Sequence, residues 1–211
     1  MKSKGFNPTE IIFSTTTACN LHCEHCFINR TPHKLEISDA VRLIESCVES
    51  SSIDRIGFSG GEPFLYMDFL IEVTKAAIDH DLMFDQIMTN GDWWRDESDL
   101  VEKLQTLYDA GYDGKIGLSW DSYHGQTTER METFIRTVQE IFGEDSINIQ
   151  TVKDENKGGE SLPLARTSLL ATPSPRGSAP KTPVISPRVS EGNSIVRASE
   201  RTTPPSLSIF V

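Results

Sequence analysis

The feature that most constrains the fold is a regular alternation of strand-like and helix-like sequence. Short apolar runs rich in β-branched and aromatic residues predict five strands, at Ile11–Thr17, Ile53–Ser59, Phe84–Thr89, Ile116–Trp120 and Ile147–Val152. Each gap between them is long enough for a helix. Strands joined by helical crossovers pair in parallel, with the helices packed outside the sheet. The sequence therefore predicts an α/β fold built on a parallel sheet.

Four amphipathic patterns fill these gaps. The first begins at Ser38 as its predicted N-cap, and the third begins near the N-cap candidate Asp96 and ends at Gly111. The fourth follows Thr127 or Thr128 and stops at Gly143, because glycine commonly stands just past a helix end. Positions expected to face the sheet are Val41, Ile44, Cys47, Val48, Phe69, Val73, Ala76, Ala77, Leu100, Leu104, Leu107, Met131, Phe134, Ile135, Val138 and Ile141.

Four polar or glycine-rich segments stand where predicted strands end. A cysteine-rich segment follows the first strand, Gly60–Pro63 the second, Asn90 the third, and Asp121 the fourth. In parallel α/β folds, reactive groups gather at the carboxyl ends of the strands. The sequence therefore predicts that these segments converge on one rim.

Three cysteines in the first of these segments have the spacing Cys-x3-Cys-x2-Cys, at Cys19, Cys23 and Cys26. Thiolate is the normal ligand of iron–sulfur clusters, and a 4Fe–4S cluster has four irons to ligate. Three cysteines would leave one iron open to a ligand that is not protein. The alternative is a zinc site closed by His22, His25 or His33, although zinc sites usually pair their cysteines and no second Cys-x2-Cys is present.

The cysteine spacing resembles that of the radical S-adenosylmethionine (SAM) superfamily, and three further segments support the resemblance. Ser59–Pro63 is similar to the glycine-rich segment that follows the second strand in that family. Met88–Gly91 and Leu118–Ser122 are similar to the ends of its third and fourth strands. His25 stands where the family usually has an aromatic residue. The resemblance covers about residues 10–125.

The resemblance implies a partial (βα) barrel, which this chain completes only as far as a fifth strand. It also implies a 4Fe–4S cluster held by the three cysteines, with SAM bound to the open iron through its amino and carboxylate groups. Reduction by an electron donor such as flavodoxin or ferredoxin would cleave SAM to methionine and a 5′-deoxyadenosyl radical, which abstracts hydrogen from a small-molecule or peptide substrate. The implied cofactor-binding residues are Gly60, Gly61, Glu62, Pro63, Asn90, Ser119 and Asp121.

Each of these residues also has a plainer interpretation. Gly-Gly-Glu-Pro and Asn90-Gly91 are common turn signals, and an Asp at a strand end often caps the next element. His124 is predicted to be a solvated loop residue, and Cys47 a buried structural residue. Trp93 and Trp94 could wall a pocket or pack the loop, and the sequence does not decide between these roles.

Composition changes sharply near residue 154. Residues 1–153 carry 26 acidic and 13 basic side chains, whereas residues 154–211 carry 5 and 7 and contain eight of the eleven prolines. Such a proline- and serine-rich stretch buries too little apolar surface to offset the entropy of ordering it. The predicted organisation is an incomplete radical SAM core at 1–153 and a disordered tail at 154–211. A frameshift, a truncated gene or a spliced-on exon is the hypothesis for this change.

The acidic core argues against nucleic acid as a partner, because phosphate binding needs clustered Lys and Arg. No apolar run reaches the roughly 18 residues of a membrane span, and the first ten residues lack the apolar core of a signal peptide. Four cysteines in such a chain favour reduced thiols in the cytoplasm. The sequence thus supports a cytoplasmic radical SAM enzyme. The alternatives are an inactive truncated or frameshifted fragment and a zinc-binding interaction module.

Overall fold

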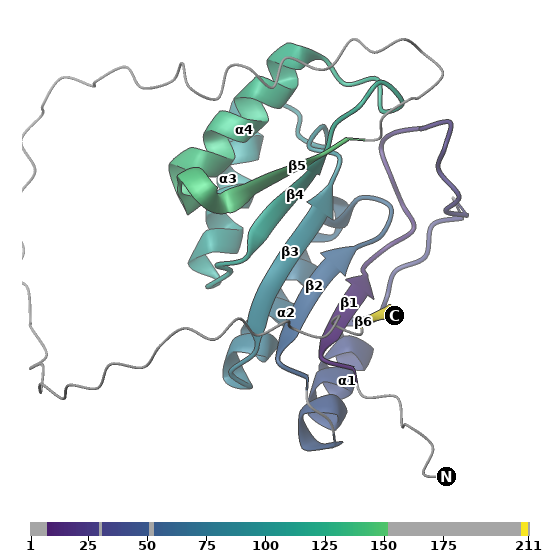
Figure 1. Cartoon of the computed structure of the whole chain (residues 1–211), viewed down its shortest axis with the longest axis vertical. Coiled ribbons are helices and arrows are strands. Elements are labelled where there is room, and N and C mark those ends of the chain that lie inside the picture. The colour runs from purple at the N-terminus through teal and green to yellow at the C-terminus, as the bar shows by residue number, and fades with distance from the viewer. Residues whose placement is uncertain (1–7, 30, 51–52, 152–207, 211) are drawn as a thin grey trace, which may run out of the picture. The chain divides into compact units, whose positions relative to one another are not determined.

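The predicted strands form one parallel sheet (Figure 1). The computed structural model describes residues 8–29, 31–50, 53–151 and 208–210, all within one structural unit. Among these residues the sheet has six strands in the order β5-β4-β3-β2-β1-β6, and every neighbouring pair is parallel. The strands are β1 (Glu10–Ser14), β2 (Arg55–Ser59), β3 (Met83–Thr89), β4 (Lys115–Ser119), β5 (Ile147–Gln150) and β6 (Ser208–Phe210). The predicted α/β class is confirmed.

The sixth strand was not predicted. Ser208–Phe210 pair in parallel with β1, opposite the side on which β1 meets β2. Among the described residues, β5 forms the other edge of the sheet. The rest of the predicted disordered tail, residues 154–207 and 211, lies outside the described residues, as does the boundary proposed at residue 153.

Four α-helices connect the first five strands. They are α1 (Ile37–Ser50), α2 (Met67–Asp79), α3 (Glu97–Asp109) and α4 (Thr128–Phe142), with short 3₁₀ helices η1 (Pro63–Tyr66) and η2 (Glu144–Ser146). Each α-helix contacts the next, so the four form one layer along the sheet, from α1 near β1 to α4 near β5 (Figure 1). Among the described segments, every helix is too short or too polar to cross a lipid bilayer.

The helix caps follow the sequence at two of the three predicted starts. Asp96 caps α3, accepting a hydrogen bond from the Asp99 amide at 2.9 Å, and Thr127 caps α4 through the Arg130 amide. The prediction for Ser38 was wrong, because α1 begins at Ile37 and Ser38 is its second residue. The Glu36 carbonyl accepts the amides of Asp39 and Ala40, so a backbone group begins this helix.

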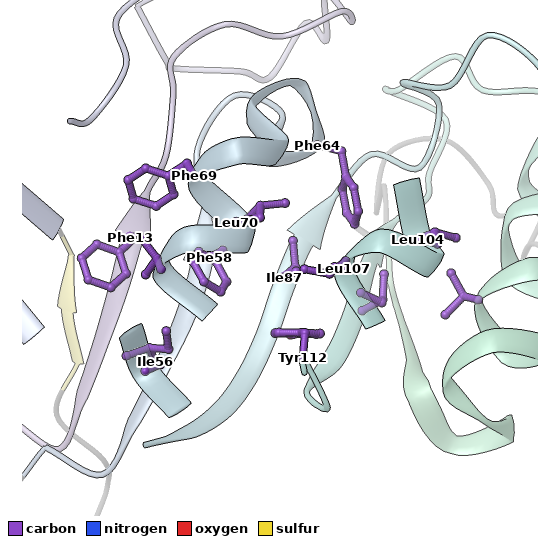
Figure 2. Packing of buried hydrophobic residues seen from close by; sticks show 14 of the residues in the cluster. Phe13, Ile56, Phe58, Phe64, Phe69, Leu70, Ile87, Leu104, Leu107 and Tyr112 are labelled. Atoms are coloured by element: carbon purple, nitrogen blue, oxygen red, sulfur yellow. The ribbon is translucent and has the colours of Figure 1, made fainter. Parts of the chain in front are cut away.

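The core lies between the sheet and the helix layer. Phe13, Phe58 and Phe69 pack with ring centroids 6.0 to 6.4 Å apart, and Figure 2 shows them close to Leu70. Burying each such ring contributes about 2 kcal/mol to folding. Nearly all the positions predicted to face the sheet are buried or half-buried, Cys47 among them. Val48 is the exception, with 36% of its surface exposed at the end of α1.

Candidate functional site

The segments that follow β1, β2, β3 and β4 meet at the carboxyl rim of the sheet, as predicted. The first is the cysteine loop, residues 15–36, which carries Cys19, Cys23 and Cys26. Its two ends are tied together, because the Thr17 amide donates to the His33 carbonyl and the Leu35 amide to the Thr15 carbonyl, each at 3.0 Å. The loop thus leaves the sheet at β1 and returns beside its own start before α1 begins.

The three cysteines differ in exposure. Cys19 and Cys23 are half-buried, whereas Cys26 is exposed. Cys19 Sγ accepts hydrogen bonds from the Leu21 amide at 3.4 Å and from Asn90 Nδ2 at 3.7 Å. Burial raises the pKa of the Cys19 thiol, and those two hydrogen bonds partly oppose the shift. The first cysteine is therefore fixed to the end of β3, while the third faces solvent.

The glycines after β2 let the cysteine loop approach closely. The Gly61 amide donates to the Thr16 carbonyl at 2.6 Å, and the Glu62 amide to the Ala18 carbonyl at 2.8 Å. A Cβ on Gly61 would lie 2.2 Å from the Ala18 oxygen, and Gly60 has a φ of +134°. Glycine is required here because backbone fills the space that a side chain would take. These contacts set the position of Cys19.

Glu62 joins the second and third segments. It is fully buried, and its Oε1 accepts hydrogen bonds from the Phe64 amide at 3.1 Å and Thr89 Oγ1 at 2.8 Å. Its Oε2 accepts the Asn90 amide at 2.8 Å. Burial raises the pKa of Glu62 to about 7, against the pull of the hydrogen bonds from Asn90, Thr89 and Phe64. Pro63 follows as the first residue of η1 and is also buried.

The segment after β3 is packed rather than open. Trp93 stacks on Phe64 with centroids 4.4 Å apart and donates its indole N–H to Thr89 Oγ1 at 3.1 Å. Trp94 lies under the guanidinium of Arg130, 3.6 Å from the ring centroid, and donates to the Gly91 carbonyl. Both tryptophans are buried, which settles the question that the sequence left open in favour of loop packing.

The segment after β4 contacts the cysteine loop. Asp121 is buried, and its Oδ1 lies 2.7 Å from His124 Nδ1 and accepts the Tyr123 amide at 2.9 Å. The prediction of a solvated His124 was wrong, because only 12% of its side chain is exposed. The His25 ring meets the rings of His124 and Tyr123 edge-on, each at a centroid distance of 5.1 Å.

Sequence reasoning missed Gln126. Its Nε2 donates to the Asn90 carbonyl at 2.6 Å and to the Ser119 carbonyl at 2.9 Å, and so links the ends of β3 and β4. Gln126 belongs to no motif and to no periodic pattern. Only the three-dimensional arrangement brings its amide to these two carbonyls.

Comparison with known proteins shows which family has this arrangement of strands and motifs. The family model of the radical SAM superfamily matches residues 13–143, more than half of the chain. The chain belongs to the radical SAM superfamily. It is 31% identical over 113 residues to an S-adenosylmethionine-dependent nucleotide dehydratase of Selenomonas ruminantium, covering 53% of this chain and 39% of that protein. It is 33% identical over 75 residues to a GTP 3′,8-cyclase of Streptomyces coelicolor, covering 33% and 22%.

The fold agrees with this membership. The structure of BtrN in complex with AdoMet (SAM) and 2-DOIA superposes with a TM-score of 0.51 at 16% identity, covering 69% of this chain and 57% of that one. The curated relatives described above are enzymes, and the radical SAM family typically uses a 4Fe–4S cluster with SAM. The chain spans less than half the length of either curated relative.

The donor set of this radical SAM chain fits an iron–sulfur cluster in its chemistry. Cys19, Cys23 and Cys26 lie on one loop, and their thiolates are the ligands that such clusters require. Within the described residues, no three Cys, His, Asp or Glu side chains already stand together as a metal-binding group. Binding a cluster therefore requires the loop to draw its thiols together around the fixed Cys19.

Proposed function

We propose that this protein is a radical SAM enzyme whose 4Fe–4S cluster is held by Cys19, Cys23 and Cys26. The observation that carries the proposal is the joined rim, in which Asn90 contacts Cys19 while Glu62 holds the Asn90 backbone. When bound, the reduced cluster and SAM supply reductive cleavage of the sulfonium, yielding methionine and a 5′-deoxyadenosyl radical that takes hydrogen from a substrate.

The residues of the rim would receive SAM beside the cluster. Gly60 and Gly61 keep side chains out of the space next to the cysteine loop. The Glu62 carboxylate, which is buried and hydrogen-bonded, would have to exchange one of its present donors for the SAM ammonium group. Pro63 stiffens the exit of that segment through its fixed φ. Asn90, Ser119 and Asp121 stand at the ends of β3 and β4, where ligands of parallel sheets bind.

The proposal also includes partners beyond the cofactors. A one-electron donor such as flavodoxin or ferredoxin would reduce the cluster, and the substrate would be a small molecule or a peptide. The four cysteines of the chain fit a reducing compartment such as the cytoplasm. The acidic balance of the chain, with 31 acidic against 20 basic residues, disfavours nucleic acid as a partner.

The proposal is tested by anaerobic reconstitution with iron and sulfide, followed by electron paramagnetic resonance of the reduced protein with and without SAM. We expect a 4Fe–4S signal that changes when SAM is added, together with methionine and 5′-deoxyadenosine in the reaction mixture. Cys26→Ala should abolish the signal. Its matched control, Cys47→Ala, removes a thiol on α1 outside the cysteine loop and should keep it.

Two results would overturn the proposal. About one zinc per chain without sulfide would favour a zinc-binding interaction module. A cluster signal indifferent to SAM would favour an inactive fragment, in which the motifs persist without the pocket.

A further inference from the structure

The side-chain amide of Asn90 has one fixed orientation. Its Oδ1 accepts the Asp92 amide at 2.8 Å, so its Nδ2 must point the opposite way. There Nδ2 donates to Asn20 Oδ1 at 2.9 Å and to Cys19 Sγ at 3.7 Å. Because the acceptor side is occupied by a backbone N–H, flipping the amide would place two donors against each other. The group that faces Cys19 is therefore the donor.

The backbone of Asn90 is held as firmly as its side chain. Its amide donates to Glu62 Oε2 at 2.8 Å, and its carbonyl accepts Gln126 Nε2 at 2.6 Å. Only 6% of the residue is exposed. On the cysteine loop, Asn20 Nδ2 donates to the Asp92 carbonyl at 3.1 Å, so the two Asn side chains tie both segments reciprocally. The Asn90 side-chain amide therefore cannot move with the Cys19 sulfur if the cysteine loop shifts. The hydrogen bonds between the two segments hold the loop in place.

We propose that Asn90 sets the reduction potential of the cluster through its hydrogen bond to Cys19, an inference that rests on the proposed function. One-electron reduction by an external donor adds negative charge to the iron–sulfur unit, part of which resides on the ligating sulfurs. A hydrogen bond to a charged acceptor strengthens as that charge grows. Donors to the sulfurs therefore stabilise the reduced state and raise the potential.

Within the described residues Cys19 Sγ has two hydrogen-bond donors, and Asn90 is the one that a substitution can remove. The second donor is the Leu21 amide, which belongs to the backbone of the loop and persists when side chains are replaced. Burial of Asn90 keeps water from replacing the lost donor. A positioning role alone would alter how much cluster binds, whereas donation to sulfur alters the potential of the cluster that does bind.

The test is a redox titration of the reconstituted protein without SAM, using dithionite as reductant and paramagnetic resonance of the reduced cluster as the signal. Asn90→Ala removes the donor. We expect it to lower the ratio of reduced to oxidised cluster about tenfold at a fixed solution potential, a shift of about 59 mV for a one-electron couple. Asn90→Asp keeps an acceptor for the Asp92 amide but places negative charge beside Cys19, so its potential should fall further.

The matched control is Asn20→Ala, which removes the other partner of Asn90 Nδ2 and leaves the bond to sulfur in place. Its potential should change less than that of Asn90→Ala. Wild-type potentials in both Asn90 variants, at normal iron and sulfide content, would overturn this inference alone. Variants that bind no cluster while the wild type does would also overturn it, since Asn90 would then act only in holding the loop. A wild-type protein that binds no cluster would instead defeat the proposed function.

Discussion

The two halves of the rim are built very differently. The cysteine loop is largely exposed beyond Cys19, and Phe27, directly after Cys26, is 97% exposed. Glu62, Thr89 and Asn90, which we call the Glu62 cluster, are at most 6% exposed and are joined by direct hydrogen bonds. A segment with few buried contacts rearranges at small cost, whereas a buried hydrogen-bonded cluster does not. At such a site the metal ligand next to the buried cluster would be held in place, and the ligands on the exposed part of the loop could move.

Replacing Gly61 with Ala should displace the cysteine loop from the buried side of the rim, and of these changes it should affect cluster binding most. The new Cβ would lie 2.2 Å from the Ala18 carbonyl oxygen, which is backbone and cannot rotate away. We expect a loss of about 3 kcal/mol in the free energy of unfolding, typical of overpacking against rigid neighbours, and loss of cluster binding. Urea denaturation and iron analysis measure the two effects.

The control for this substitution is Gly125→Ala. Gly125 has a positive φ, of +70°, and a Cβ added there would meet no atom within 4 Å. It should therefore cost only the backbone strain, about 1 kcal/mol, and leave cluster binding intact. Equal losses in the two variants would contradict the view that the glycine pair positions Cys19.

The pH dependence of stability should report the burial of Glu62. Its folded-state pKa is about 7, above the ordinary 4.5, so the folded protein holds this proton more tightly than the unfolded chain does. The stability linked to Glu62 is then complete below pH 4.5 and is lost as pH rises through 7. Relative to Glu62→Gln, the wild-type free energy of unfolding should fall by about 3 kcal/mol across that range.

Denaturant titrations of both proteins at several pH values measure this difference, in which the contributions of other carboxylates cancel. A difference that stays constant with pH would mean that the three donors to Glu62 fully offset its burial. A difference of the opposite sign would mean that they exceed it, as for a carboxylate whose pKa is lowered by hydrogen bonds.

The interactions of Arg130 test the packing on the buried side of the rim, and replacing this residue should have a smaller effect on stability. Its guanidinium pairs with Asp92, donates to the Trp94 carbonyl at 2.6 Å and lies over the Trp94 ring. Arg130→Lys keeps the charge but loses the planar fork and the stacking, so we expect a loss of about 1 kcal/mol. Thermal unfolding with Arg136→Lys as the control checks this, because the Arg136 guanidinium has a long, exposed pairing with Glu97, at 3.9 Å. Equal effects would show that the stacking contributes nothing.

The sequence predicted the sheet and its rim because those features repeat along the chain. Periodic apolar positions report which face of an element is buried, and the geometry of parallel strands brings their ends together. Gln126 and the pairing of Asp121 with His124 escaped prediction because they depend on side-chain directions within irregular loops. The strand Ser208–Phe210 escaped for another reason. Three residues carry no usable period, and their partner, β1, lies far earlier in the chain, at Glu10–Ser14.

Replacing Phe27 should have the smallest effect on the free energy of unfolding. It also tests most directly whether the exposed side of the rim is packed. A Phe that is 97% exposed buries almost nothing, so Phe27→Ala should change the free energy of unfolding by less than about 0.5 kcal/mol. Phe64→Ala is the matched comparison within the rim, since Phe64 is 1% exposed and stacks on Trp93, and it should cost about 4 kcal/mol. If Phe27→Ala instead destabilised the protein by more than about 1 kcal/mol in denaturant titrations, the cysteine loop would have to be packed in solution. The contrast between an exposed cysteine loop that can rearrange and a rigid, buried Glu62 cluster would then be wrong.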